Sequence, residues 1–211
     1  MELNNTDGDL GIHGSIDGDA WSLLNVEDPR ERTILRLSAM GRLRQQGMTQ
    51  LFFESAEPTF DELSPAEFFK RFPEGEYSIE AISLEGDILF GDVMLSHVMA
   101  APPSHITLSG TPAARNCSDT LPVISGPVVI RWDPVVMSHP TIGRTGPVEI
   151  VRYQFFVEIG STKLAVDLPP TVTEFEVPRE ILRLGNRFKF EIIARTATGN
   201  NTAVENCFLT R

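Results

Sequence analysis

Short runs in which apolar and polar residues alternate recur along this chain, which is the pattern of β-strands with one buried face. In residues 10–17, for example, Leu10, Ile12 and Ile16 alternate with His13, Ser15 and Asp17. Turn-forming residues separate the runs about every 8–12 residues, as in β-sandwiches. The runs cover residues 10–17, 21–28, 32–40, 49–55, 75–97, 127–135, 148–160, 173–178, 187–199 and 202–211. Residues 75–97 are predicted to form a hairpin with its turn at Glu85-Gly86-Asp87, because Gly86 tolerates positive φ. The pattern as a whole predicts an all-β protein.

One short helix is predicted over about residues 64–71. Ser64 stands at the N-cap, Pro65 at the first helical position and Glu67 three residues after the cap. This is a capping box with proline where its missing N–H costs nothing. Phe68, Phe69 and Phe72 form an apolar stripe at helical spacing, which favours packing on the core over a ligand role.

Charge divides the chain into an acidic half and a neutral half. Residues 1–103 hold 7 Lys and Arg against 19 Asp and Glu, whereas residues 104–211 hold 11 against 10. Pro102-Pro103 cannot continue a strand ladder. We therefore expect two tandem β-sandwich domains, an acidic one over residues 1–103 and a second over residues 104–211.

The net charge of −11 argues against several classes of partner. Nucleic acids and anionic membrane surfaces require a basic face, which the composition does not supply. No apolar run approaches the ~20 residues that span a bilayer, so we expect no membrane insertion. Polar residues follow Met1 at once, so no signal peptide is visible. A cytoplasmic protein and a mature chain whose signal peptide is not part of this sequence both fit, and we expect the second.

Three features of the second half are shared with one known family. Trp132 in "VVIRWDPV" is followed by a proline, "IVRYQFFVEIG" places Tyr153 among alternating apolar residues, and "LRLGNRFKFEIIARTATGN" contains a corner and then a glycine turn. These strands resemble the fibronectin type III family over roughly residues 120–211. The resemblance implies a β-sandwich with Trp132 on its second strand and in its core.

This half departs from the family pattern at the corner. Phe188 stands where the family carries a tyrosine that bonds back to the backbone, and Leu184 stands where it favours proline. Phe188 keeps the ring but loses a hydrogen bond worth about 1 kcal/mol. No Arg-Gly-Asp tripeptide is present, so the family's integrin ligand is not carried over.

The two cysteines, Cys117 and Cys207, form no Cys-x-x-Cys motif and cannot hold zinc alone. In a fibronectin type III sandwich the first and last strands run side by side, and the two cysteines lie near those strands. The resemblance therefore implies a disulfide between them, with two buried thiols as the alternative. A disulfide indicates an oxidising compartment, so we expect an extracellular or periplasmic location.

The N-terminal half is loosely similar to the acidic β-sandwich domains of bacterial secreted proteins. The segment of this half with the most candidate metal ligands contains Asp7, Asp9, Asp17 and Asp19 in two Asp-Gly-Asp triplets. An EF-hand register begun at Asn5 fails, because its glycine and glutamate positions hold Leu10 and Ile16. Two Asp-Gly turns at the ends of one strand are the simpler interpretation. Calcium bound by these aspartates is the alternative.

No catalytic motif is present, and none of HExxH, Gly-x-Ser-x-Gly or a phosphate loop occurs. His105 and His139 lie in Pro-rich segments, where a lone histidine is more often solvated than catalytic. The carboxylates of Glu54, Glu57, Asp61 and Glu62 do not define a hydrolase cleft. Asp61 or Glu62 is expected to favour the start of the Ser64 helix.

The sequence therefore predicts a non-catalytic secreted or cell-surface module that binds a protein or polysaccharide or serves a structural role. One alternative is a carbohydrate-binding accessory module, which needs a row of exposed aromatic rings. Its candidates are Trp21, Tyr77, Trp132 and Tyr153. The other alternative is a hydrolase with a site at the domain junction, near His97 and His105.

Overall fold

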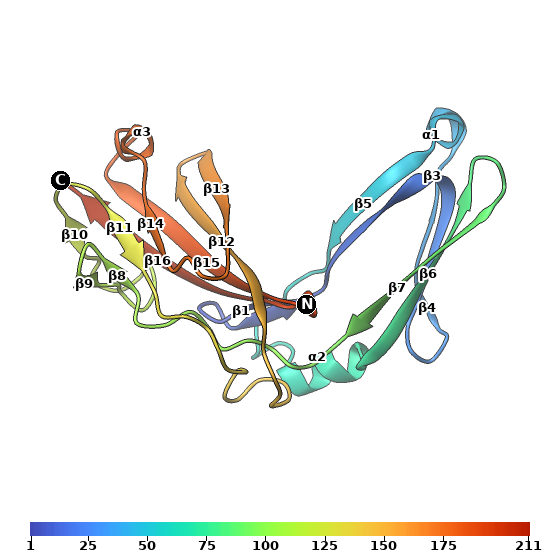
Figure 1. Cartoon of the computed structure of the whole chain (residues 1–211), viewed down its shortest axis with the longest axis horizontal. Helices are drawn as coiled ribbons and strands as arrows, with labels where there is room; N and C mark the ends of the chain where they lie inside the picture. The colour runs from blue at the N-terminus through green and yellow to red at the C-terminus, as the bar shows by residue number, and fades with distance from the viewer. The chain divides into compact units, whose positions relative to one another are not determined.

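The computed structural model describes the whole chain, Met1–Arg211, and its strands form three sheets with three short helices (Figure 1). The predicted all-β class is confirmed. No helix is long and apolar enough to cross a membrane. The chain forms two compact units, which are Gly11–His97 with Met1, and Val98–Arg211 with Glu2–Leu10. We call these the first and the second unit.

The second unit contains two sheets. One has the strand order β14-β11-β8-β9, and the other the order β13-β12-β15-β16-β1-β2 with β10 also on β16. The strands of the first sheet are β8 (Thr107–Leu108), β9 (Thr111–Pro112), β11 (Val129–Arg131) and β14 (Glu174–Glu176). Those of the second are β1 (Glu2–Asn4), β2 (Asp9–Gly11), β10 (Val123–Ile124), β12 (Ile150–Ile159), β13 (Thr162–Leu168), β15 (Arg187–Thr196) and β16 (Asn201–Thr210). Helix α3 (Arg179–Leu182) connects β14 to β15.

This strand order is that of a fibronectin type III-like sandwich. The indole of Trp132 lies parallel to the ring of Phe155, with 6.0 Å between centroids, and meets Tyr153 edge-on at 5.4 Å. The Tyr153 hydroxyl accepts a hydrogen bond of 2.9 Å from the backbone N–H of Val135. Phe188 is fully buried and stacks on Phe208 at 5.0 Å. The predicted core tryptophan is confirmed, and a ring without a hydroxyl fills the corner.

The N-terminal residues complete this sandwich. β1 pairs in parallel with β16, with Leu3 opposite Thr202. The compact units therefore divide the chain at His97–Val98 and again near Leu10, and not at residue 103. This pairing joins segments about 200 residues apart, which alternation within one segment does not reveal. Independent folding of the two halves stays a prediction.

The first unit is built on one five-stranded sheet with the order β4-β3-β6-β7, and β5 also pairs with β3. Its core contains Trp21, Leu24, Val26 and Ala81. The strands are β3 (His13–Glu27), β4 (Thr33–Ser38), β5 (Met48–Glu54), β6 (Gly75–Ser83) and β7 (Ile88–Leu95), and the helices are α1 (Gly41–Gln46) and α2 (Pro65–Arg71). Strand β3 replaces the two separate strands expected over residues 10–28, and α1 and α3 were not foreseen.

Local signals in the first unit are confirmed. The Ser64 hydroxyl accepts a hydrogen bond from the backbone N–H of Glu67 at the start of α2. β6 and β7 form the predicted hairpin, and Gly86 in its turn has φ 94°, which favours glycine.

At the β3–β4 turn, Asp28 accepts hydrogen bonds from the backbone N–H groups of Arg30 and Arg32. The Arg32 guanidinium lowers the pKa of Asp28 to about 2.

Candidate functional site

The first unit contains a groove of about 560 Å³ between the first half of β3 and the β6–β7 hairpin. Apolar side chains and carboxylates line it together. The apolar lining residues are Ile16, Trp21, Leu24, Ile79, Ala81, Ile88, Leu89 and Phe90. The carboxylates are those of Asp17, Asp19 and Asp92, and no Lys or Arg lies among the lining residues. We call this the acidic groove.

An irregularity in β3 places two of these carboxylates. Residues His13 to Asp17 pair with β5, and the register then shifts between Asp17 and Trp21. Trp21 pairs both with Met48 of β5 and with Ser83 of β6, so pairing with β6 begins where the register against β5 has shifted. Asp17-Gly18-Asp19 is therefore a bulge just before β3 gains β6 as a second partner, and the expected turn at this triplet is wrong. Both aspartates are exposed.

Trp21, which lines the acidic groove, carries a buried polar group. The residue is 1% exposed, and its Nε1–H has no hydrogen-bond acceptor. A buried donor without an acceptor costs about 1–3 kcal/mol. The Nε1 atom is itself closed to solvent, so the groove offers apolar contact and negative charge but not this donor.

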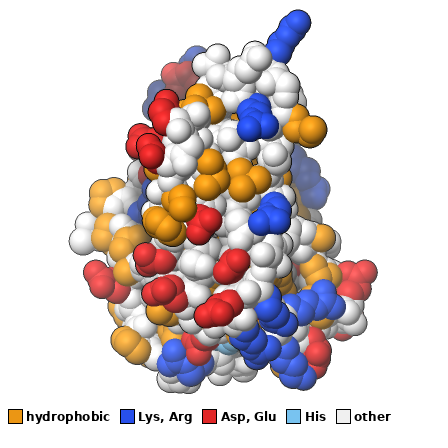
Figure 2. Space-filling view, turned by 90° about the vertical axis from the view of Figure 1, so that its right-hand side faces the viewer, with side chains coloured by type: hydrophobic (Ala, Val, Ile, Leu, Met, Phe, Trp, Pro, Cys, Tyr) orange, Lys and Arg blue, Asp and Glu red, His pale blue; other side chains and the backbone are white.

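The β6–β7 hairpin forms the opposite wall and is exposed and acidic. Phe90 is 78% exposed, and Ile88, Val93 and Met94 are each more than half exposed. Residues 75–95 contain five Asp and Glu and no Lys, Arg or His. Figure 2 looks onto the side of the molecule where β4 and β6 lie in Figure 1, and shows acidic side chains beside hydrophobic ones. Sequence reasoning found this hairpin but not its exposure, because alternation does not distinguish an edge strand from a central one.

The other predicted aspartates lie in the second unit. Asp7 stands in the turn between β1 and β2, where its backbone N–H donates to Asn4 Oδ1 at 3.2 Å and Gly8 has φ 71°. The expected turn is therefore found at Asp7-Gly8-Asp9. No three His, Cys, Asp or Glu side chains lie close enough together to hold a metal ion. Calcium at Asp7, Asp9, Asp17 or Asp19 stays a proposal.

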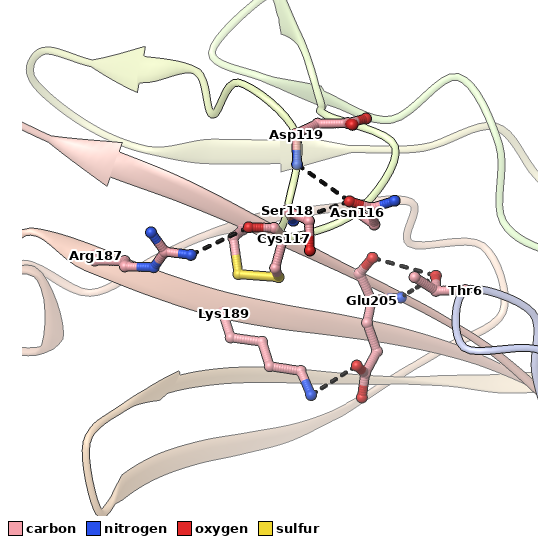
Figure 3. Close-up of a disulfide and its surroundings, with 9 residues drawn as sticks. Thr6, Asn116, Cys117, Ser118, Asp119, Arg187, Lys189 and Glu205 are labelled. Atoms are coloured by element: carbon pink, nitrogen blue, oxygen red, sulfur yellow. Dashed lines mark hydrogen bonds and ion pairs between the residues drawn. A yellow bond between two sulfur atoms is a disulfide. The ribbon is translucent and has the colours of Figure 1, made fainter.

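The structure contains a disulfide between Cys117 and Cys207, whose Cα atoms are 4.9 Å apart (Figure 3). Cys207 lies on β16, and Cys117 lies in the segment between β9 and β10. The Arg187 guanidinium donates to the carbonyl of Cys117 at 3.1 Å. On the same strand, the Glu205 backbone exchanges two hydrogen bonds with the Thr6 hydroxyl, at 2.8 and 3.2 Å. The bond thus fixes a connecting segment against the last strand.

Each histidine has a structural partner within its own unit. His13 Nε2 lies 2.7 Å from Glu57 Oε1, and His97 Nε2 lies 2.7 Å from the carbonyl of Phe72. His105 Nδ1 lies 2.8 Å from Asp133 Oδ2 on the surface of the second unit. None of the three lines the acidic groove.

His139 is not solvated as expected but buried. Its Nδ1 accepts hydrogen bonds from the backbone N–H groups of Thr141 and Ile142, so its Nε2–H donates to Asn5 Oδ1 at 3.1 Å. Burial lowers the pKa of His139, which favours this neutral form. His139 therefore ties the segment Glu2–Leu10 to the rest of the second unit. Its place in a Pro-containing loop gave no signal of burial.

The carboxylates considered for hydrolysis have local roles. Glu57 contacts His13, and Glu62 accepts a hydrogen bond from the Thr59 backbone N–H at 3.1 Å. Glu62 therefore closes the loop before α2, and the support of the helix start by Asp61 or Glu62 stays a prediction. The four aromatic residues considered for carbohydrate stacking are all buried, namely Trp21, Tyr77, Trp132 and Tyr153.

Sequence reasoning missed Glu191 on β15. It lies opposite Glu205 on β16. Burial, with the nearby carboxylates of Glu205 and Glu2, raises the pKa of Glu191 to about 7. Glu205 is itself paired with Lys189 at 2.6 Å. The sequence shows one glutamate on each of two predicted strands. Only the register of those strands reveals that the two carboxylates face each other.

A scan against protein-family models found no match. A search of curated proteins also found none. Among solved structures, a two-domain fibronectin type III segment of chicken tenascin is 13% identical, with 97% of this chain and 94% of that chain covered and a TM-score of 0.33.

Two bacterial adhesins are also similar. A 1.5-MDa ice-binding adhesin is 13% identical, with 99% of this chain and 59% of that one covered and a TM-score of 0.28. A Ca²⁺-stabilized ice-binding adhesin of an Antarctic bacterium is 12% identical, with 99% and 46% covered and a TM-score of 0.29. This chain thus spans about half the length of the adhesin chains it matches. Such identities and TM-scores carry no argument about function.

Proposed function

We propose that this chain is a non-catalytic extracellular binding module. In this proposal the second unit is a structural domain held by a disulfide, and the first unit binds a partner protein. The observation that carries the proposal is the acidic groove, which joins apolar residues and three carboxylates. Large exposed apolar patches mark interaction sites in soluble proteins. The Cys117–Cys207 bond supports an oxidising compartment.

Binding by the groove is favoured over catalysis because its lining residues lack a nucleophile paired with a base. Ser15 is the only hydroxyl among the lining residues, and no histidine accompanies it. Nucleophilic catalysis requires a base within hydrogen-bond reach of the nucleophile. Carbohydrate binding is disfavoured because the Trp and Tyr rings are buried.

Site-specific photo-crosslinking tests the proposal in the cells that produce the protein. A benzophenone amino acid is placed at Phe90 in the groove, or at Lys163 on β13 of the second unit as the control. We expect a discrete adduct with a secreted or surface protein from position 90 and none from position 163. Adducts of equal yield from both positions, or from neither, would contradict a binding role for the groove.

A further inference from the structure

The free edge of β7 has the features of a docking site for another strand. β7 is the last strand in the order β4-β3-β6-β7 and pairs with β6 alone. Its eight residues, "ILFGDVML", include one charged side chain, no lysine and no proline. The pairing with β6 runs without a register shift from Gly75–Leu95 to Ile82–Ile88. Natural edge strands are usually short, bulged, or protected by lysine or proline, and β7 has none of these features.

The hydrogen-bond pattern shows which backbone groups are unused. The Ser83 backbone N–H donates to the carbonyl of Asp87 at 2.9 Å, so residue 87 faces β6. In an antiparallel ladder this orientation alternates along the strand. Residues 88, 90, 92 and 94 therefore direct their N–H and C=O groups away from β6. Such a row, repeating at about 6.8 Å, matches the backbone of an added strand.

The charge of this region indicates the chemistry of the added strand. Asp92 lies on β7 itself, Glu80 lies opposite Phe90 on β6, and Asp17 and Asp19 line the adjoining acidic groove. An added strand would thus meet carboxylates on both of its faces. A second copy of this chain would instead bring the same five carboxylates of residues 75–95, and like charges on paired strands are destabilising.

We propose that β7 binds an extended, lysine- or arginine-rich segment of a partner protein by strand addition. Backbone hydrogen bonds along residues 88–94 hold the segment, apolar side chains contact Phe90 and the groove, and cations meet Asp92, Asp17 and Asp19. Recognition through an exposed sheet edge is a recurring mode of peptide binding. This inference rests on the proposed binding role, because it names the partner of that same site.

The test uses the full chain, labelled with ¹⁵N, and a capped eight-residue peptide of alternating lysine and valine. On addition of the peptide, the amide signals of residues 88, 90, 92 and 94 are expected to shift and to gain protection from hydrogen exchange. The amides of residues 89, 91 and 93 already face β6, so their protection is expected to change little. Absence of this alternation along β7 would overturn the proposal.

Two matched peptides separate strand addition from simple charge attraction. The same peptide with four consecutive N-methylated residues keeps its charge but loses ladder donors, and is expected to bind at least tenfold more weakly. A peptide of alternating glutamate and valine is expected not to bind. Equal binding of the methylated and unmethylated peptides would overturn strand addition.

A pair of charge-matched variants locates the site. Asp92→Lys is expected to weaken binding of the lysine–valine peptide at least tenfold, whereas Glu176→Lys on β14 makes the same charge change and should leave it unaltered. The ¹⁵N spectrum of each variant reports whether it is folded.

Protection of residues 88–94 that rises with protein concentration, without peptide, would show a second copy on the edge and overturn the proposal. Failure of the peptide alongside a photo-crosslink at position 90 would reject strand addition and leave the binding role intact.

Discussion

Two strand edges of this molecule differ in how far they are covered: the edge of β16 is almost fully covered, and the edge of β7 is open. Along β16, β1 pairs with residues 201–203, the Thr6 hydroxyl bonds Glu205, the disulfide reaches Cys207, and β10 pairs with residues 209–210. Hardly any of that edge remains open. Along β7 no strand, loop or disulfide covers the edge, and Phe90 is 78% exposed.

The covered edge and the open edge have different consequences for association with other chains. A covered edge prevents pairing with other chains. Covering it here requires that the N-terminal residues and the segment around Cys117 lose conformational entropy. An open apolar edge is a hazard unless it has a partner. The negative charge of residues 75–95 reduces that hazard by repelling other copies of the chain. The covered edge thus disfavours association of the second unit, and under the proposed function the open edge of the first unit binds a partner.

Removal of the disulfide has the largest expected effect on the covered edge. With Cys117 and Cys207 both changed to serine, the free energy of unfolding of the second unit should fall by about 4 kcal/mol, because the bond closes a loop of 90 residues. Urea unfolding followed through NMR signals of the second unit measures this loss. Mass spectrometry of natively secreted, alkylated protein checks the bond itself, and two alkylated thiols would contradict it.

Glu191→Gln tests the carboxylates beside the covered edge. Glu191 titrates near 4.5 when unfolded and near 7 when folded. The folded state therefore binds more protons between these pH values, and the stability of the wild type falls as pH rises through the window. Above pH 7 the variant should be more stable by roughly 2–3 kcal/mol, and below pH 4.5 the two should agree. A carboxyl ¹³C titration of Glu191 with a midpoint near 4.5 would refute this account.

Thr6→Val removes the hydroxyl that bonds Glu205 at two points. The expected loss is about 1–2 kcal/mol, because one N–H and one C=O of β16 lose their partner. Thr6→Ser keeps the hydroxyl and should retain most of the stability. Hydrogen exchange at the Glu205 amide should accelerate in the valine variant only, and equal exchange in both variants would contradict the role given to Thr6.

Calcium is expected to have the smallest effect on either edge. Asp7 and Asp9 lie in the hairpin that covers β16, and no three candidate ligands lie together there. Thermal unfolding with excess calcium and with chelator should therefore agree within a few degrees. A midpoint shift above about 10 °C would require several kcal/mol of binding energy and would establish a site.

Local and family-wide patterns in the sequence predicted the scaffold well. Ser64, Pro65 and Glu67 predicted α2 because capping is decided within one turn of chain. Trp132 and Tyr153 predicted the sandwich core because the family places rings at those strand positions. Gly86 predicted the hairpin turn because its backbone conformation favours glycine.

Features that depend on pairing between distant segments were not predictable. The bulge at Asp17-Gly18-Asp19 lies where the register of β3 against β5 shifts and pairing with β6 begins, and the pattern of a single strand does not show which strands pair with it. The pairing of β1 with β16 and the contact of His139 with Asn5 each span more than 130 residues. The acidic groove depends on such pairings too, so its composition was visible in the sequence but its existence was not.

The disulfide also has a mechanical consequence. Under tension applied at the chain ends, a domain extends as its strands detach, and each released residue adds about 3.4 Å of contour length. The covalent bond bypasses the chain from Cys117 to Cys207, a sequence separation of 90, so these residues cannot add roughly 300 Å of extension. Force passes from the segment before Cys117 through the sulfur atoms to the last residues of β16. A pulled chain would thus retain most of the second unit as a closed loop, even after its hydrogen bonds had broken.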